Sequence, residues 1–139
     1  FDMLRLAATK MSTQEGDEDG QKGAIVNMAS VAAFDGQIGQ AAYSASKGGI
    51  VGLTLPVARD LSAAGIRLNT VAPGLIDTPI YGEGPESEAF KANLGANVLF
   101  PKRLGSGDEL ASMVMELLTN PYMNAQTIRV DGGIRMPPK

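Results

Sequence analysis

The stretch AIVNMAS, residues 24–30, decides the fold of this chain. Its first six residues form a short apolar run with β-branched members, which is typical of a strand buried on both faces in a parallel sheet. After a loop, residues 43–64 predict a helix, since apolar side chains recur at three- and four-residue steps, at Ile50, Leu53, Val57 and Leu61. IRLNTVAPG, residues 66–74, then predicts a second strand that ends in a Pro-Gly turn. The order strand, helix, strand is typical of a parallel βαβ unit.

The segments on either side continue this alternation. Residues 1–11 predict a helix with no start signal before it, and the polar residues 12–23 predict an exposed acidic loop. Residues 75–105 predict an irregular segment with a short helix near ESEAFKANLG. A capping box, Ser106 with Glu109, then begins an amphipathic helix.

A last strand is predicted within AQTIRVDGG, residues 125–133. Three strands are few for a doubly wound sheet. We therefore expect an α/β fold, a Rossmann-type doubly wound parallel sheet, of which residues 1–139 are the C-terminal half of a single domain.

Composition excludes several kinds of chemistry. The chain has 139 residues, a net charge of −3, no cysteine and no histidine. It therefore holds no disulfide, no Cys or His metal site and no Ser-His-Asp triad, and we expect no metal. The mild acidity argues against nucleic-acid binding, and no apolar run approaches the ~20 residues that span a bilayer. The absence of cysteine fits a reducing compartment, and we expect a cytoplasmic location.

Tyr43 and Lys47 stand four residues apart, on one face of the predicted helix. Forming a phenolate at pH 7 ordinarily costs about 4 kcal/mol. A cation ~4 Å away, at an effective dielectric of ~20, contributes about the same. Such a pair therefore suits a general acid or base. Taken alone, it also fits a surface tyrosine stacked on a lysine stem.

Two further features accompany the pair at strand ends, where ligands bind in such sheets. Ser30 ends the first strand, and its hydroxyl can donate a hydrogen bond to a substrate oxygen. In NTVAPGLIDTPI, the turn at Pro73 and Gly74 brings the backbone near Ile76 and the Thr78 hydroxyl toward a polar ligand. Taken singly, each also fits an ordinary turn.

In combination, the strand with its serine, Y-x-x-x-K on the next helix and N-x-x-x-P-G-x-x-x-T resemble the second half of a short-chain dehydrogenase/reductase. The ending IRVDGG is also similar to that family's last strand. The resemblance covers the whole chain. It implies that the family's Gly-rich dinucleotide-binding turn belongs to an N-terminal half that this chain does not contain.

The resemblance also implies a role for each matching residue. Tyr43 is then the general acid/base, Lys47 holds the nicotinamide ribose and stabilises the phenolate, and Ser30 orients the substrate oxygen. The nicotinamide end of the cofactor is expected to meet the main chain at three positions and one hydroxyl, namely Pro73, Gly74, Ile76 and Thr78. We place Gln37 and Gln40 at the substrate mouth, and residues 79–100 in the substrate loop.

Within the family, the acidic loop before AIVNMAS together with SVAAFDGQIGQAAYSASK most resembles the type-2 3-hydroxyacyl-CoA dehydrogenases. This implies NAD as cofactor, an acyl-CoA or other secondary alcohol as small-molecule substrate, and a homotetramer. An NADPH-dependent 3-oxoacyl-carrier-protein reductase is the alternative enzyme, and a non-catalytic scaffold subunit of the same fold is the alternative of another class.

Overall fold

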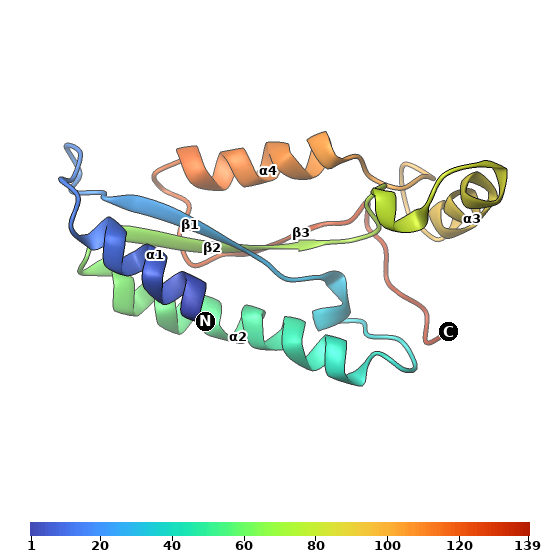
Figure 1. Cartoon of the computed structure of the whole chain (residues 1–139), viewed down its shortest axis with the longest axis horizontal. Helices are drawn as coiled ribbons and strands as arrows, with labels where there is room; N and C mark the ends of the chain where they lie inside the picture. Colours follow the sequence, from blue (N-terminus) through green and yellow to red (C-terminus); the bar gives the residue numbers. More distant parts are fainter.

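Three parallel strands form the centre of the computed structural model, which describes residues 1–139 (Figure 1). Their order across the sheet is β1-β2-β3, and the α/β fold class is confirmed. The strands are β1 (Gly23–Met28), β2 (Ile66–Pro73) and β3 (Thr127–Val130). The helices are α1 (Asp2–Ser12), α2 (Ala41–Ser62), α3 (Pro85–Ala96) and α4 (Gly107–Thr119), with 3-10 turns η1 (Val31–Ala33) and η2 (Pro79–Tyr81).

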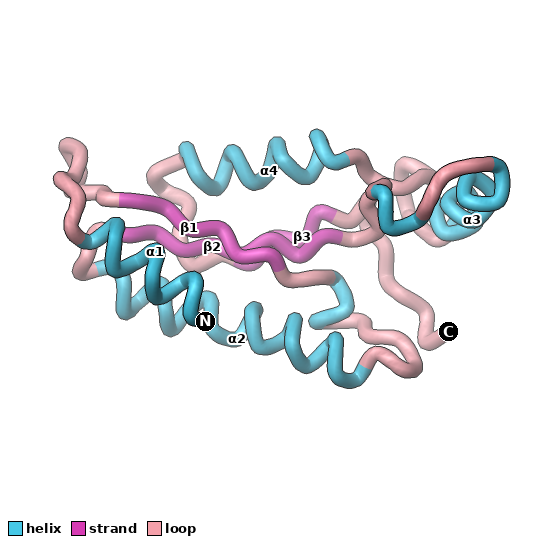
Figure 2. The backbone as a smooth tube through the Cα atoms, in the orientation of Figure 1, coloured by secondary structure: helices cyan, strands magenta, loops and turns pink.

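The helices cover both faces of the sheet. Figures 1 and 2 show α1 and α2 on one face and α4 on the other, and α3 beyond the carboxyl ends of the strands. Because the three strands are parallel, their carboxyl ends all lie at one end of the molecule. No helix in the chain combines the length and the apolar character needed to cross a lipid bilayer.

Burial differs between the strands because of their places in the sheet. Residues 66–72 of β2 are all buried, as expected for a central strand with helices on both faces. β1 was predicted to be buried on both faces, but its residues are only partly buried and Met28 is exposed. The physical reason is that β1 pairs only with β2 in this chain and leaves its other edge open.

Helix α2 begins two residues before the predicted start, and its two fully buried residues lie on the predicted face but were not among the residues named for it. Ile50, Leu53, Val57 and Leu61 are only partly buried, whereas Thr54 and Ala58 are buried. The hydroxyls of Thr54 and Thr70 of β2 lie 2.6 Å apart, so the helix packs on the sheet through small residues and one buried hydrogen bond. Hydrophobic periodicity alone does not detect such a contact.

The later elements follow the prediction in type but differ in length. α3 has 12 residues, more than the short helix expected there. β3 is shorter than predicted, because the chain turns after Val130 through Gly132 and Gly133, which both have positive φ. The predicted capping box is confirmed: Glu109 N–H donates to Ser106 Oγ at 3.2 Å, and Ser106 N–H donates to a Glu109 carboxylate oxygen at 2.7 Å.

Candidate active site

Ser30 ends the extended segment after β1 and begins the η1 turn. Its Oγ accepts a hydrogen bond from Ala32 N–H at 3.1 Å, and its carbonyl accepts one from Ala33 N–H at 3.0 Å. Since the hydroxyl oxygen is the acceptor, the hydroxyl proton remains available for donation to a ligand. An accepted hydrogen bond also strengthens the donor character of the same hydroxyl.

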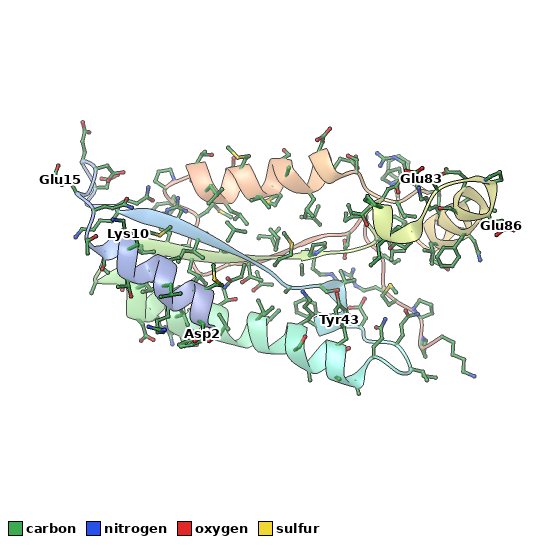
Figure 3. The ribbon with its side chains drawn as sticks, viewed as in Figure 1. Asp2, Lys10, Glu15, Tyr43, Glu83 and Glu86 are labelled. Carbon is green, nitrogen blue, oxygen red and sulfur yellow. The ribbon has the colours of Figure 1, made fainter.

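Tyr43 and Lys47 lie together in the first turns of α2, as the four-residue spacing predicted. Figure 3 labels Tyr43 on this helix. The Lys47 Nζ is 5.7 Å from the centroid of the Tyr43 ring and donates a hydrogen bond to the Met28 carbonyl at 3.1 Å. Met28 is the last residue of β1, two positions before Ser30. An ammonium has three N–H donors, so this arrangement leaves two for a ligand. A surface stacking contact alone does not account for the bond to the strand end.

The turn after β2 is held against β3. Gly74 N–H donates to the Val130 carbonyl at 2.9 Å. A Cβ on Gly74 would lie 2.7 Å from the Cβ of Asp131, so this close approach admits only glycine. Close packing against Asp131 thus explains why the predicted turn has a glycine at position 74.

Ile76 forms an isolated parallel bridge with Gly105. The hydrogen bonds of this bridge run from Gly105 N–H to Leu75 O and from Asp77 N–H to Gly105 O, at 2.9 and 2.8 Å. The N–H and C=O of Ile76 itself take part in neither and make no other hydrogen bond in the chain. The hydroxyl of the exposed Thr78 likewise makes none, so both residues offer polar groups to a ligand.

Gln37 and Gln40 already have partners within the chain. Gln40 Oε1 accepts a hydrogen bond from Gln37 N–H at 3.0 Å, and Gln37 Nε2 donates to the Pro137 carbonyl at 3.0 Å. These bonds shape the loop between η1 and α2. The assignment of the two side chains to a substrate mouth stays a prediction.

Tyr81 of η2 adds an aromatic side chain from the predicted substrate loop. Its ring centroid lies 6.2 Å from that of Phe90 in α3. Burial raises the pKa of the Tyr81 phenol, with smaller contributions from the charges of Asp77 and Tyr43.

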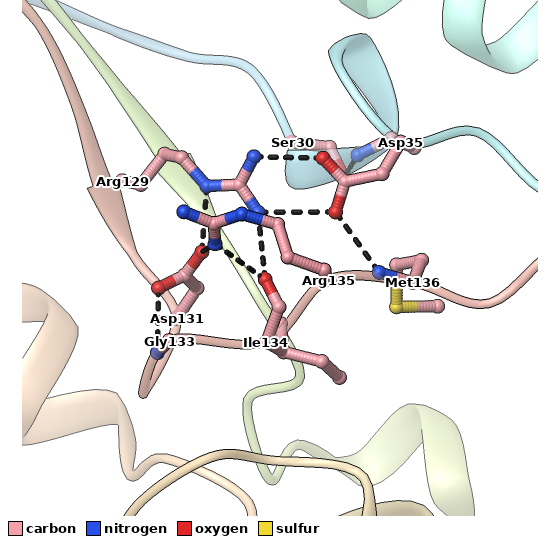
Figure 4. Close-up of polar contacts among 9 residues, drawn as sticks. Ser30, Asp35, Arg129, Asp131, Gly133, Ile134, Arg135 and Met136 are labelled. Carbon is pink, nitrogen blue, oxygen red and sulfur yellow. Dashed lines mark hydrogen bonds and ion pairs between the residues drawn. The ribbon is translucent and has the colours of Figure 1, made fainter.

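Sequence reasoning missed the ion-pair cluster shown in Figure 4, formed by Asp35, Arg129, Asp131 and Arg135. The hydrogen bond from Arg129 is the main reason that the pKa of Asp35 is lowered, and the Asp35 bond is the main reason that the pKa of Arg129 is raised. An arginine inside the short last strand is the only sequence signal for this cluster.

Asn69 was quoted in the predicted motif without a role, and the structure gives it one. It is fully buried in β2, where its Nδ2 donates to the Met123 carbonyl at 2.8 Å and its Oδ1 accepts from Gln126 N–H at 3.0 Å. The side chain thereby ties the central strand to the turn before β3.

These groups fit the nicotinamide end of a dinucleotide. The ammonium of Lys47 and the hydroxyl of Tyr43 suit the hydroxyls of a ribose. The unpaired N–H and C=O of Ile76 match the acceptor and donor of a carboxamide, and the close turn at Gly74 brings this backbone to the strand ends.

Comparison with known proteins decides the family. A family model described as enoyl-(acyl carrier protein) reductase matches residues 1–135. The chain belongs to the short-chain dehydrogenase/reductase family. Membership in this family implies a nicotinamide cofactor, in agreement with the polar groups at the strand ends.

Several members of the family are similar over most of the chain. The chain is 54% identical over 138 residues to 3-hydroxyacyl-CoA dehydrogenase type-2 of Homo sapiens, covering 99% of this chain and 52% of that protein. It is 40% identical over 116 residues to 3-oxoacyl-[acyl-carrier-protein] reductase of Rattus norvegicus, covering 84% of this chain and 47% of that protein.

A solved structure confirms the likeness in three dimensions. The crystal structure of 3-hydroxyacyl-CoA dehydrogenase type-2 from Mycobacterium avium is 49% identical, with a TM-score of 0.91 over 98% of this chain and 52% of that chain. The chain thus spans about half the length of the curated relatives it matches.

Proposed function

We propose that this chain is the C-terminal half of an NAD-dependent oxidoreductase that interconverts a 3-hydroxyacyl-CoA, or a similar secondary alcohol, and its 3-oxo form. One observation carries the proposal. Lys47, hydrogen-bonded to the end of β1, lies beside Tyr43 at the same strand end where Ser30 offers a hydroxyl proton. The identity to 3-hydroxyacyl-CoA dehydrogenases type-2 supports the substrate class.

Different residues of this chain have different roles in the proposed oxidation. Ser30 donates its hydroxyl proton to the substrate oxygen and fixes its orientation. Tyr43 removes the proton of the substrate hydroxyl, while the charge of Lys47 stabilises the phenolate that accepts it. When bound, the nicotinamide supplies the acceptor for the hydride from the carbon that bears the hydroxyl. The main chain at Pro73, Gly74 and Ile76 and the Thr78 hydroxyl hold its carboxamide end.

The test is Tyr43→Phe in the full-length protein, which keeps the ring and removes the titrating hydroxyl. General acid–base catalysis contributes about 10²–10⁴-fold, and we expect a loss of that size in NADH formation from a 3-hydroxyacyl-CoA. Tyr122→Phe is the matched control, because Tyr122 is 98% exposed and its hydroxyl makes no hydrogen bond in the chain. Near-normal turnover by Tyr43→Phe would overturn the mechanism.

The choice of nucleotide separates the two enzyme candidates. The likeness to the rat 3-oxoacyl-[acyl-carrier-protein] reductase keeps a reductase as the second candidate. We expect a higher kcat/KM with NAD and a short 3-hydroxyacyl-CoA than with NADPH and a 3-oxoacyl carrier protein. The opposite order in steady-state kinetics would favour the reductase. A scaffold subunit would show no nucleotide binding by calorimetry.

The same proposal includes a homotetramer in the cytoplasm. The exposed side of α2 carries small residues, and a Cβ on Gly49 or Gly52 would meet nothing within 4 Å. Ala45, Gly49 and Gly52 therefore leave room for a helix of a second copy, whereas Gly48 is half-buried and a Cβ there would lie 4.0 Å from the Ala33 carbonyl oxygen. Sedimentation of the full-length protein as a monomer at micromolar concentration would contradict the tetramer, and cell fractionation tests the location.

A further inference from the structure

The residues between Ser30 and Tyr43 are held by a distant part of the chain. We call residues 31–40, which contain η1 and both glutamines, the serine loop. In its middle, both oxygens of the Asp35 carboxylate accept from Arg129 of β3, at 2.7 Å from Nη1 and 3.1 Å from Nη2 (Figure 4). One of these oxygens also accepts from Met136 N–H at 3.0 Å. The Asp35 carboxylate thus attaches the loop to β3 and to the segment after it.

Arg129 itself is fixed from several directions. Its Nε donates to Asp131 at 2.6 Å, and its Nη2 donates to the Ile134 carbonyl at 2.8 Å. The ring of Phe34 in the serine loop lies 5.3 Å from the guanidinium carbon. The Arg129 and Asp35 side chains are only 20% and 17% exposed. A planar guanidinium held in this way has one orientation, and it transmits that orientation to the carboxylate of Asp35.

A continuous set of short-range hydrogen bonds connects Asp35 to Ser30. Asp35 N–H donates to the Val31 carbonyl at 3.0 Å, and Ala33 N–H donates to the Ser30 carbonyl at 3.0 Å. The Ser30 Oγ accepts from Ala32 N–H within the same turn. The turn between the two residues is therefore one rigid unit. We expect a displacement of Asp35 to move the hydroxyl of Ser30.

We propose that Arg129 is a positioning residue that sets the place of the Ser30 hydroxyl through Asp35. The inference rests on the proposed function, because it assigns Ser30 to the substrate oxygen. Arg129 makes no hydrogen bond to Tyr43 or Lys47. Arg129 also bonds Asp131, which packs against Gly74, so the KM for the nucleotide separates an effect through the serine loop from one through that turn.

The test is a double-mutant cycle between Arg129→Met and Ser30→Ala in the full-length protein. A misplacement of about 1 Å near the reacting atoms costs about 10²-fold, so we expect Arg129→Met to lower kcat by about 10- to 100-fold. The KM for the nucleotide stays unchanged. In the Ser30→Ala background, the same substitution lowers kcat by less than about 3-fold, because its target is already gone.

A purely structural role predicts a different result. The loss caused by Arg129→Met would then be equal in both backgrounds, and this outcome would overturn the proposal. Asp35→Asn provides the same cycle with an isosteric side chain if Arg129→Met does not fold. Arg103→Met is the matched control, since Arg103 also pairs with both oxygens of a carboxylate, that of Glu109, and should leave kcat unchanged.

Failure of this inference is distinguishable from failure of the proposed function. If Tyr43→Phe retains full activity, the oxidoreductase mechanism itself is wrong. If Tyr43→Phe and Ser30→Ala are both impaired and the Arg129 effects simply multiply with Ser30→Ala, only the positioning role is wrong.

Discussion

Replacing Asn69 by leucine tests whether this residue of the motif serves the fold or the ligand. The side chain is 0% exposed and joins β2 to the turn before β3 through two hydrogen bonds. Leucine has a similar size but neither donates nor accepts. The substitution removes both bonds and leaves the two main-chain partners, Met123 and Gln126, in place.

The expected cost follows from what each partner loses. Gln126 N–H loses its acceptor, and an unsatisfied buried donor costs about 1–3 kcal/mol. The Met123 carbonyl keeps a second bond, from Arg67 Nη1 at 2.7 Å, so its loss is smaller, about 0.5–1.5 kcal/mol. Both bonds are only part-buried, so water recovers some of this energy. We expect the free energy of unfolding to fall by about 2 kcal/mol, a large share of the usual 5–15 kcal/mol.

Urea unfolding of the full-length protein, followed by far-ultraviolet circular dichroism, measures the change. Asn93→Leu is the control, because Asn93 lies exposed in α3 without a side-chain hydrogen bond, and a change within about 0.5 kcal/mol is expected there. Equal stabilities of the two variants would refute the packing argument. Loss of nucleotide binding by folded Asn69→Leu would show that the residue serves the ligand.

Three further outcomes follow from single contacts. The hydrogen bond from Arg103 lowers the pKa of Glu109 to about 2 from its usual 4.5, so its contribution to stability is present above pH 4.5 and is lost as the pH falls toward 2. Glu109→Gln should flatten the dependence of the unfolding midpoint on pH in that window, and an unchanged slope would contradict this. Gly74→Ala should weaken NAD binding at least tenfold in a calorimetric titration, because its Cβ would lie 2.7 Å from that of Asp131. Leu117→Ala, at a side chain with 0% exposure, should cost about 2–5 kcal/mol in denaturant unfolding, and a smaller loss would mean that the site collapses around the cavity.

Local patterns predicted the elements well where one physical signal dominates. The apolar run before Ser30 and the capping box at Ser106 and Glu109 both correspond to observed elements. On α2, the buried Thr54 was missed, because it packs by satisfying its hydroxyl on Thr70 and hydrophobicity does not register this. The partial exposure of β1 depends on strand order, which a single strand sequence does not encode.

In the candidate site, too, some features follow from the local sequence and others only from the fold. Tyr43 and Lys47 are four residues apart on one helix, so their proximity follows from helix geometry. The availability of the Ile76 main chain follows from a bridge to Gly105, nearly thirty positions along the chain. Asp35 and Arg129 are separated by 94 positions, and nothing in either local sequence indicates the other. Such contacts come from the parallel sheet, which brings all strand ends together.

The hydrogen-bond partners of the serine loop are synthesised long after the loop itself. Asp35 bonds to Arg129 and Met136, which are 94 and 101 positions later, and Gln37 bonds to Pro137, 100 positions later. At about 5–20 residues per second, a ribosome needs about 5–20 s to add ~100 residues. During this interval the nascent loop lacks the guanidinium and the carbonyl that hold it. A polypeptide interrupted just before Met136 would contain all the strands and helices described above. Its serine loop would nevertheless lack its bonds to Met136, Pro137 and Pro138.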